Sequence, residues 1–156
     1  MKFRGSFNYS VDAKLRIMLP NELRAAMKEM NTGSLIILPG FSDKYKYLFL
    51  LPKAYCDKIE TKLENLKFFD GTAQKIFTFF FGNSFEIEPD NQGRIRIPPL
   101  LHKMMGFNND VVITGEGDFM KLWEPADHAA MLKEELAPAS GRLEDLLKEI
   151  NEKYGI

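Results

Sequence analysis

The chain has 156 residues, of which 45% are hydrophobic and 28% charged, and its formal net charge is −1. This is an ordinary globular composition, and the length suits one sizeable domain or two small intertwined ones. The charge balance excludes a uniformly basic nucleic-acid binder, so any contact with DNA requires a locally basic face.

The sequence gives no sign of secretion or of a membrane helix. The first ten residues are partly basic but lack a following apolar run, so we do not expect a signal peptide. The densest apolar run, residues 76–81, is far shorter than the ~18 residues that a membrane helix needs. Cys56 is the single cysteine, which rules out an internal disulfide and favours a cytoplasmic location.

The first predicted elements lie in residues 7–52. Residues 7–23 predict a strand, a turn, a second strand and the start of a short helix after Pro20, where a missing N–H costs little. Gly33 is the expected end of that helix, because glycine favours helix C-caps. Two more strands and a helix with an apolar stripe over residues 57–66 follow.

Residues 85–101 repeat the pattern of residues 7–23. Residues 86–88 and 94–97 alternate between polar and apolar side chains, as half-buried strands do, around a turn at residues 91–93. Six positions are identical at a constant spacing of 78 residues: Phe7 and Phe85, Asp12 and Asp90, Arg16 and Arg94, Ile17 and Ile95, Pro20 and Pro98, Leu23 and Leu101. A second short helix should end at Gly106.

The C-terminal stretch predicts an amphipathic helix. Residues 141–154 place Leu143, Leu146, Leu147 and Ile150 on one face. The preceding residues 138–141 are typical of a linker, so this helix can pack separately from the rest.

One copy of the repeat cannot bury its apolar faces alone, whereas two copies can close a shared core. We therefore expect an α+β protein in which two tandem half-barrel repeats form one composite β-barrel domain with flanking helices. The expected parts are a first repeat at residues 5–54, a connecting helical segment at 55–82, a second repeat at 83–126 and a C-terminal helical tail at 127–156.

Two motifs resemble those of a known family. Phe3-Arg4-Gly5 followed by Asp12-Ala13-Lys14-x-Arg16 resembles the opening of MraZ proteins, and Asp90-Asn91-Gln92-Gly93-Arg94-Ile95 with Pro98 resembles their second repeat. The resemblance implies an AbrB-like swapped-hairpin barrel that assembles into rings of several subunits. It also implies a nucleoid-associated regulator of the division and cell-wall gene cluster, including its own promoter, that binds short direct repeats of double-stranded DNA through the Asp-x-x-x-Arg motifs.

The first motif departs from the family at one position. Leu15 stands where the family usually has glycine. Glycine adopts positive φ freely, whereas a branched residue pays about 1 kcal/mol or more. Either the first turn has a different conformation, or Leu15 makes a compensating contact.

The motif residues suggest a division of roles. Arginine can bind a phosphate with two hydrogen bonds or bind a guanine edge. The side chain of aspartate can stabilise a turn by accepting hydrogen bonds from the backbone N–H groups of the turn. Residues 1–34 carry six basic and three acidic side chains, which makes this part locally basic. The expected DNA-binding residues are Arg4, Lys14, Arg16 and Arg94, and the expected turn-orienting residues are Asp12, Asp90 and Gly93.

Other interpretations remain open at this point. Each Asp-x-x-x-Arg pair can be a salt bridge that only fixes a turn, and the chain can be a ring-forming interaction protein that has lost DNA binding. A hydrolase or transferase built on the paired carboxylates lacks any supporting motif, so we do not expect an enzyme. His102 and His128 are too few and too scattered for a metal site, and we expect no cofactor, no small-molecule substrate and no membrane partner.

Overall fold

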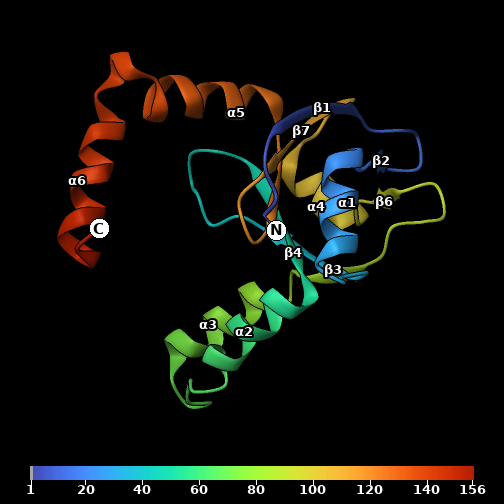
Figure 1. The fold of residues 1–156 in the computed structure, drawn as a ribbon. Coiled ribbons are helices and arrows are strands. Elements are labelled where there is room, and N and C mark those ends of the chain that lie inside the picture. Colours follow the sequence, from blue (N-terminus) through green and yellow to red (C-terminus); the bar gives the residue numbers. More distant parts are fainter. Residues whose placement is uncertain (1) are drawn as a thin grey trace.

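The computed structural model describes residues 2–156 and contains two antiparallel sheets (Figure 1). The larger sheet has six strands in the order β1 (Ser6–Ser10), β7 (Asp110–Gly115), β8 (Met120–Trp123), β4 (Tyr47–Pro52), β3 (Leu35–Pro39) and β5 (Phe85–Ile87). The smaller is a two-stranded ribbon of β2 (Arg16–Met18) and β6 (Arg94–Arg96). Together with the helices, these sheets confirm the predicted α+β class.

The strand order is symmetric between the two copies of the repeat. Exchanging β1 for β5, β7 for β3 and β8 for β4 leaves the order of the six-stranded sheet unchanged. The two edge strands pair with the opposite copy in equivalent register, with Phe7 opposite Ile113 and Phe85 opposite Ile37. In the ribbon, Ile17 lies directly opposite Ile95. The strands of the two copies therefore interlock instead of forming separate sheets.

The helices flank these sheets: α1 (Asn21–Glu29), α2 (Lys53–Leu63), α3 (Gly71–Phe80), α4 (Pro99–Met105), α5 (Pro125–Met131), the π-helical turn η1 (Leu132–Leu136), the 3-10 turn η2 (Pro138–Ser140) and α6 (Arg142–Tyr154). The helix α4 ends at Gly106 with φ +64°, as predicted. The prediction for Gly33 is wrong, because α1 is capped at Met30 and Asn31 takes the left-handed conformation at φ +55°. Asparagine tolerates this region, so the chain turns before it reaches the glycine.

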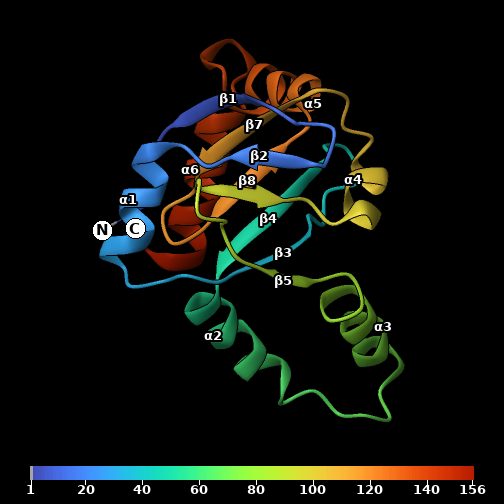
Figure 2. The ribbon, with the colours of Figure 1, turned by 90° about the vertical axis from the view of Figure 1, so that its right-hand side faces the viewer.

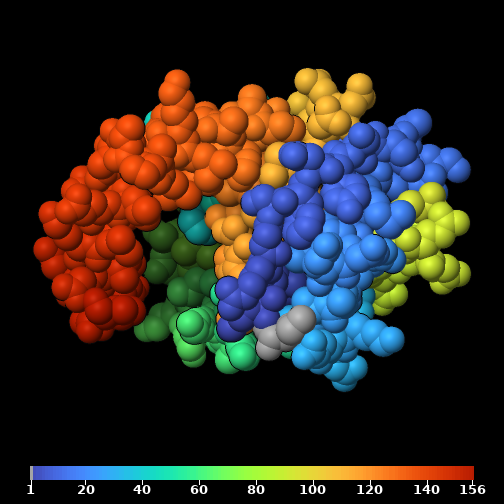
Figure 3. Space-filling view, turned by 45° about the horizontal axis from the view of Figure 1, so that its top comes forward, coloured from blue at the N-terminus to red at the C-terminus, as the bar shows by residue number. Residues whose placement is uncertain are grey.

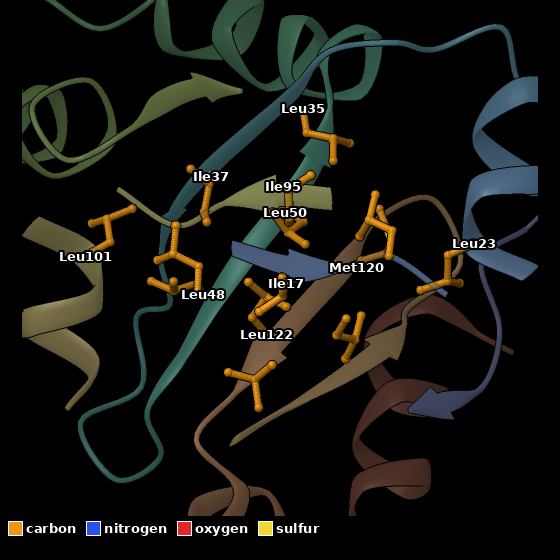
Figure 4. Close-up of a cluster of buried hydrophobic side chains, with 14 of the residues drawn as sticks. Ile17, Leu23, Leu35, Ile37, Leu48, Leu50, Ile95, Leu101, Met120 and Leu122 are labelled. Carbon is orange, nitrogen blue, oxygen red and sulfur yellow. The ribbon is translucent and has the colours of Figure 1, made fainter. Parts of the chain in front are cut away.

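One hydrophobic core lies between the ribbon and the inner face of the large sheet (Figure 4). Ile17 and Ile95 enter it from the ribbon and are 1% and 0% exposed. Both copies contribute equivalent residues from their central strands and first helices: Leu48, Leu50, Met120 and Leu122, with Leu23 and Leu101. Burial of the ribbon's inner side chains leaves its other side chains to face solvent.

The outer face of the sheet is covered by two groups of helices. The pair α2 and α3 projects from the sheet (Figure 2) and packs through Cys56 and Phe80 on Leu38 and Leu51. The segment that begins with α5 packs near Trp123, with Met131 against the same cluster. Within residues 2–156, no helix is long and apolar enough to cross a membrane.

Candidate nucleic-acid interface

The first turn is built around the carboxylate of Asp12. Its Oδ1 accepts hydrogen bonds from the backbone N–H groups of Lys14 at 2.9 Å and Arg16 at 2.8 Å. Its Oδ2 accepts a bond from Arg16 Nε at 2.8 Å. The Asp12 N–H donates to the Arg16 carbonyl at 3.0 Å, which closes the loop. One carboxylate thus fixes both the turn and the direction of the guanidinium group.

The second turn repeats this arrangement. Asp90 Oδ1 accepts from the backbone N–H groups of Gln92 and Arg94, both at 2.9 Å, and Asp90 Oδ2 accepts from Arg94 Nε at 2.9 Å. The Asp90 N–H donates to the Arg94 carbonyl at 2.8 Å. The two loops project on the same side of the molecule (Figure 1).

Leu15 keeps the conformation that glycine has in the second turn. Its φ is +62°, beside +79° for Gly93, and each residue donates its N–H to the preceding aspartate carbonyl at 3.0 Å. The Leu15 side chain is half-buried and packs against the main core. The turn is therefore conserved in shape between the copies, and apolar packing offsets the backbone strain at Leu15.

The ribbon between the turns presents arginines on its outer face. Arg16 lies opposite Arg96 and Met18 lies opposite Arg94, while the isoleucines between them face the core. Because strand side chains alternate, the three arginines share one side of the ribbon. Arg16 and Arg94 are diagonal neighbours in this register, a separation of about 7–8 Å between Cα atoms.

The guanidinium groups on this face keep unused donors. The Nε atoms of Arg16 and Arg94 are bound to aspartate, but their terminal Nη atoms have no protein acceptor within residues 2–156. Arg96 is exposed and has no ion pair in that range. Arg16, which is paired with Asp12, lies directly opposite Arg96. The face is therefore suited to an anion that lies across the ribbon.

Both aspartates are unsuited to acid–base chemistry near neutral pH. The backbone N–H of Arg16 chiefly lowers the pKa of Asp12, and the N–H of Arg94 chiefly lowers the pKa of Asp90. Bonds from the arginine side chains act in the same direction. The two carboxylates hold the turns as anions.

The remaining predicted residues are not all at the ribbon. Lys14 is exposed at the first turn, where the second copy has Gln92. Gly93 adjoins Arg24 of α1, since a Cβ there would lie 2.7 Å from Arg24 Cδ. Arg4 precedes β1 in the sequence and lies beside the β7–β8 hairpin. The structure does not bring it to the two Asp-x-x-x-Arg turns.

Sequence reasoning missed Arg96 and Arg24. The first copy has Met18 at the position of Arg96, so comparison of the copies did not select it. The alternation of Arg94, Ile95 and Arg96 is the signal that could have identified it, because it places both arginines on one face. Arg24 carries no such signal, since its contact with Gly93 depends on how the copies interlock.

The fold and the ribbon define a class: an α+β protein in which two equivalent, interlocked copies of one unit present a shared cationic face. Comparison with known sequences identifies the family of the chain. It belongs to the MraZ family. Residues 80–149 match the family described as "MraZ protein, putative antitoxin-like".

Several curated relatives share most of their length with this chain. "Transcriptional regulator MraZ" of Nitrosospira multiformis is 31% identical over 144 residues, which cover 92% of this chain and 96% of the relative. The protein of the same name from Coxiella burnetii is 30% identical over 148 residues, covering 95% and 96%. That of Acetivibrio thermocellus is 33% identical over 122 residues, covering 78% and 80%. These relatives are named as regulators and not as enzymes.

Proposed function

We propose that this protein is a transcriptional regulator that binds double-stranded DNA through the outer face of the β2–β6 ribbon. The observation that carries the proposal is the set of three guanidinium groups on one face, two of them directly opposite each other. Arg16 and Arg94 are each paired with an aspartate only through Nε, so their terminal N–H groups and the exposed Arg96 are left to bind an anionic partner. A two-stranded ribbon fits the major groove, where arginine can bind guanine edges as well as phosphates.

Each residue of the interface has a distinct role in this proposal. Arg16, Arg94 and Arg96 contact DNA, with Lys14 reaching a phosphate from the first turn. Asp12, Asp90 and Gly93 position the turns and do not touch DNA. Arg4 lies away from the ribbon, so we assign it a minor contribution at most.

The proposal extends to the architecture. Residues 5–54 and 83–126 are two AbrB-like units whose exchanged strands close one barrel, joined by residues 55–82 and followed by a tail at 127–156. The strand order, which is unchanged when the copies are exchanged, supports this division. Leu15 no longer favours a protein that has lost DNA binding, because the first turn retains its geometry.

The proposed regulator acts in the cytoplasm, on the nucleoid, as a ring. Its target would be direct repeats upstream of the division and cell-wall gene cluster, including its own promoter. Weak contacts from several subunits add up when one DNA segment reaches more than one of them, so a ring gains affinity from repeated sites.

A gel-shift titration tests the DNA contact. Wild type should bind the DNA upstream of its own gene more tightly than a random duplex of equal length, and added salt should weaken binding. Arg16→Ala combined with Arg94→Ala should weaken binding at least tenfold. Lys67→Ala, in the loop between α2 and α3, is the matched control and should bind as wild type. Equal binding of wild type to both duplexes would contradict sequence-specific recognition.

A further inference from the structure

The apolar stripe of the amphipathic helix α6 is exposed to solvent within residues 2–156. Its apolar side chains Leu143, Leu147, Ile150 and Tyr154 recur at i, i+4, i+7 and i+11, so they form one stripe. Leu147 is 62% exposed and Tyr154 70%. The helix packs mainly on η1 and η2 and stands apart from the sheet (Figures 1 and 3). An isolated helix of this length is marginal in water, so α6 needs a packing surface.

A matching surface lies elsewhere on the same chain. An apolar groove of about 500 Å³ runs between the outer face of β4 and the α2–α3 pair. Aromatic and aliphatic side chains form its walls: Phe41, Phe49, Tyr55, Ile76, Phe79 and Phe119. Phe41 at its mouth is 78% exposed, and Lys121 is the only charged residue of the lining. Such a groove is suited to the apolar face of a helix.

We propose that the groove of one copy receives α6 of a second copy. Within one chain, an ion pair from Arg142 to Glu135 at 3.2 Å joins α6 to η1. Glu134 is held in turn by Lys44 at 2.6 Å and by the Tyr45 hydroxyl at 2.8 Å. With these contacts in place, the α6 stripe and the groove both remain open, and we assign each as the partner of the other in a neighbouring copy. The inference specifies the contact that closes the proposed ring and therefore rests on that part of the proposed function.

A single contact between α6 and the groove is small. A 13-residue helix is about 20 Å long and 10 Å wide, so burying half of its side wall covers about 300 Å². Stable two-protein interfaces bury ~800 Å² on each partner, so one such contact is weak. The helix and the groove are different surfaces, so two copies that exchange helices would form a closed pair, whereas copies that each pass the helix to the next would form a head-to-tail ring. In a closed ring, each copy makes two of these contacts.

Light scattering at tens of micromolar protein tests the contact. Wild type should be an oligomer, and Leu147→Glu, in the stripe, should be a monomer with unchanged circular dichroism. Lys148→Glu is the matched control on the polar face of α6 and should remain an oligomer. Ile76→Glu, in the groove wall, should also give a monomer. Oligomers of wild-type size for both Leu147→Glu and Ile76→Glu would overturn the inference and leave the ring to another surface.

Disulfide trapping distinguishes a second copy from the same chain. In a Cys56→Ser background, mixing Leu147→Cys protein with Ile76→Cys protein under mild oxidation should give a cross-linked dimer that exceeds the dimers of either protein alone. A monomer-sized cross-linked product from a chain carrying both cysteines, without a mixed dimer, would mean that α6 folds onto its own groove and would overturn the inference.

DNA binding separates this contact from the ribbon. Leu147→Glu should weaken binding to a fragment with two target repeats by at least tenfold and leave binding to a one-repeat fragment unchanged. The Arg16→Ala and Arg94→Ala variant should weaken binding to both fragments. If Leu147→Glu binds the two-repeat fragment as wild type does, the inference fails while the DNA-binding proposal stands.

Discussion

At Leu15, a branched side chain occupies a backbone region that normally favours glycine, with φ +62°. The sequence identified this position as anomalous but left two outcomes open, because the size of the compensating contact depends on tertiary packing. The same limit applies to Arg24, whose contact with Gly93 joins the two copies. By contrast, the Asp-x-x-x-Arg spacing was sufficient to predict that each aspartate holds its turn, because those bonds are local.

Gly93→Ala should destabilise the protein by about 2 kcal/mol, because alanine at φ +79° is strained and its Cβ would also crowd Arg24. Gly117→Ala is the matched control: its φ is +86°, but a Cβ there meets no atom within 4 Å. The control should lose only about 1 kcal/mol. Urea denaturation measures both values, and equal losses would show that the contact with Arg24 has no cost.

The free energy of unfolding should decrease as the pH falls below about 4. The pKa values of Asp12 and Asp90 are lowered in the folded state, so their stabilising contribution is present above the unfolded pKa. It is lost as the pH falls through the folded values. The double variant Asp12→Asn and Asp90→Asn should show a shallower decrease between pH 5 and pH 3 in urea titrations. An unchanged slope would mean that these carboxylates do not contribute to it.

Cys56 should resist alkylation in the folded protein. The thiol is buried, and burial raises its pKa to about 12, so almost no thiolate forms at pH 8. The sequence showed that Cys56 is the single cysteine, but it could not show that the side chain points into the cluster under α2. Iodoacetamide should label the protein only after unfolding in urea, and rapid labelling of the native protein would contradict this burial.

At the scale of elements, periodicity predicted the helices and strands better than their ends. The alternation over residues 94–97 correctly indicated a strand with one buried face. The helix end at Gly33 was wrong because Asn31 can turn the chain by itself. The start of α3 carries a local signal in Asp70, whose Oδ1 accepts from the N–H groups of Thr72 at 2.8 Å and Ala73 at 3.4 Å.

Asp70→Ala should lower stability by about 1 kcal/mol, because it removes the N-cap of α3 and leaves two helix N–H groups without their acceptor. Asp43→Ala, at an exposed loop position, is a suitable control. The urea midpoints of both variants measure the effect, and an equal midpoint for Asp70→Ala and wild type would show that the cap is dispensable.

At the scale of the molecule, the repeat predicted that two copies share a core. The strand registers show which strands of one copy pair with which strands of the other. The spacing of 78 residues could not determine which strands pair. Strands that pair within one copy and strands that pair between copies would both give two structurally equivalent copies. The structure pairs Phe7 with Ile113 and Ile17 with Ile95, so each copy is incomplete without the other. This pairing brings Arg96 opposite Arg16, and the candidate interface therefore exists only in the assembled pair of copies.

The measurement that tests the central claim most directly is the salt dependence of DNA affinity for wild type, Arg96→Ala and Arg4→Ala. If the ribbon contacts phosphates, removing Arg96 should weaken binding and reduce the magnitude of the slope of log affinity against log salt by about 1. Arg4→Ala, away from the ribbon, should keep the wild-type slope. A wild-type slope and affinity for Arg96→Ala would contradict the assignment of the ribbon as the DNA-binding face.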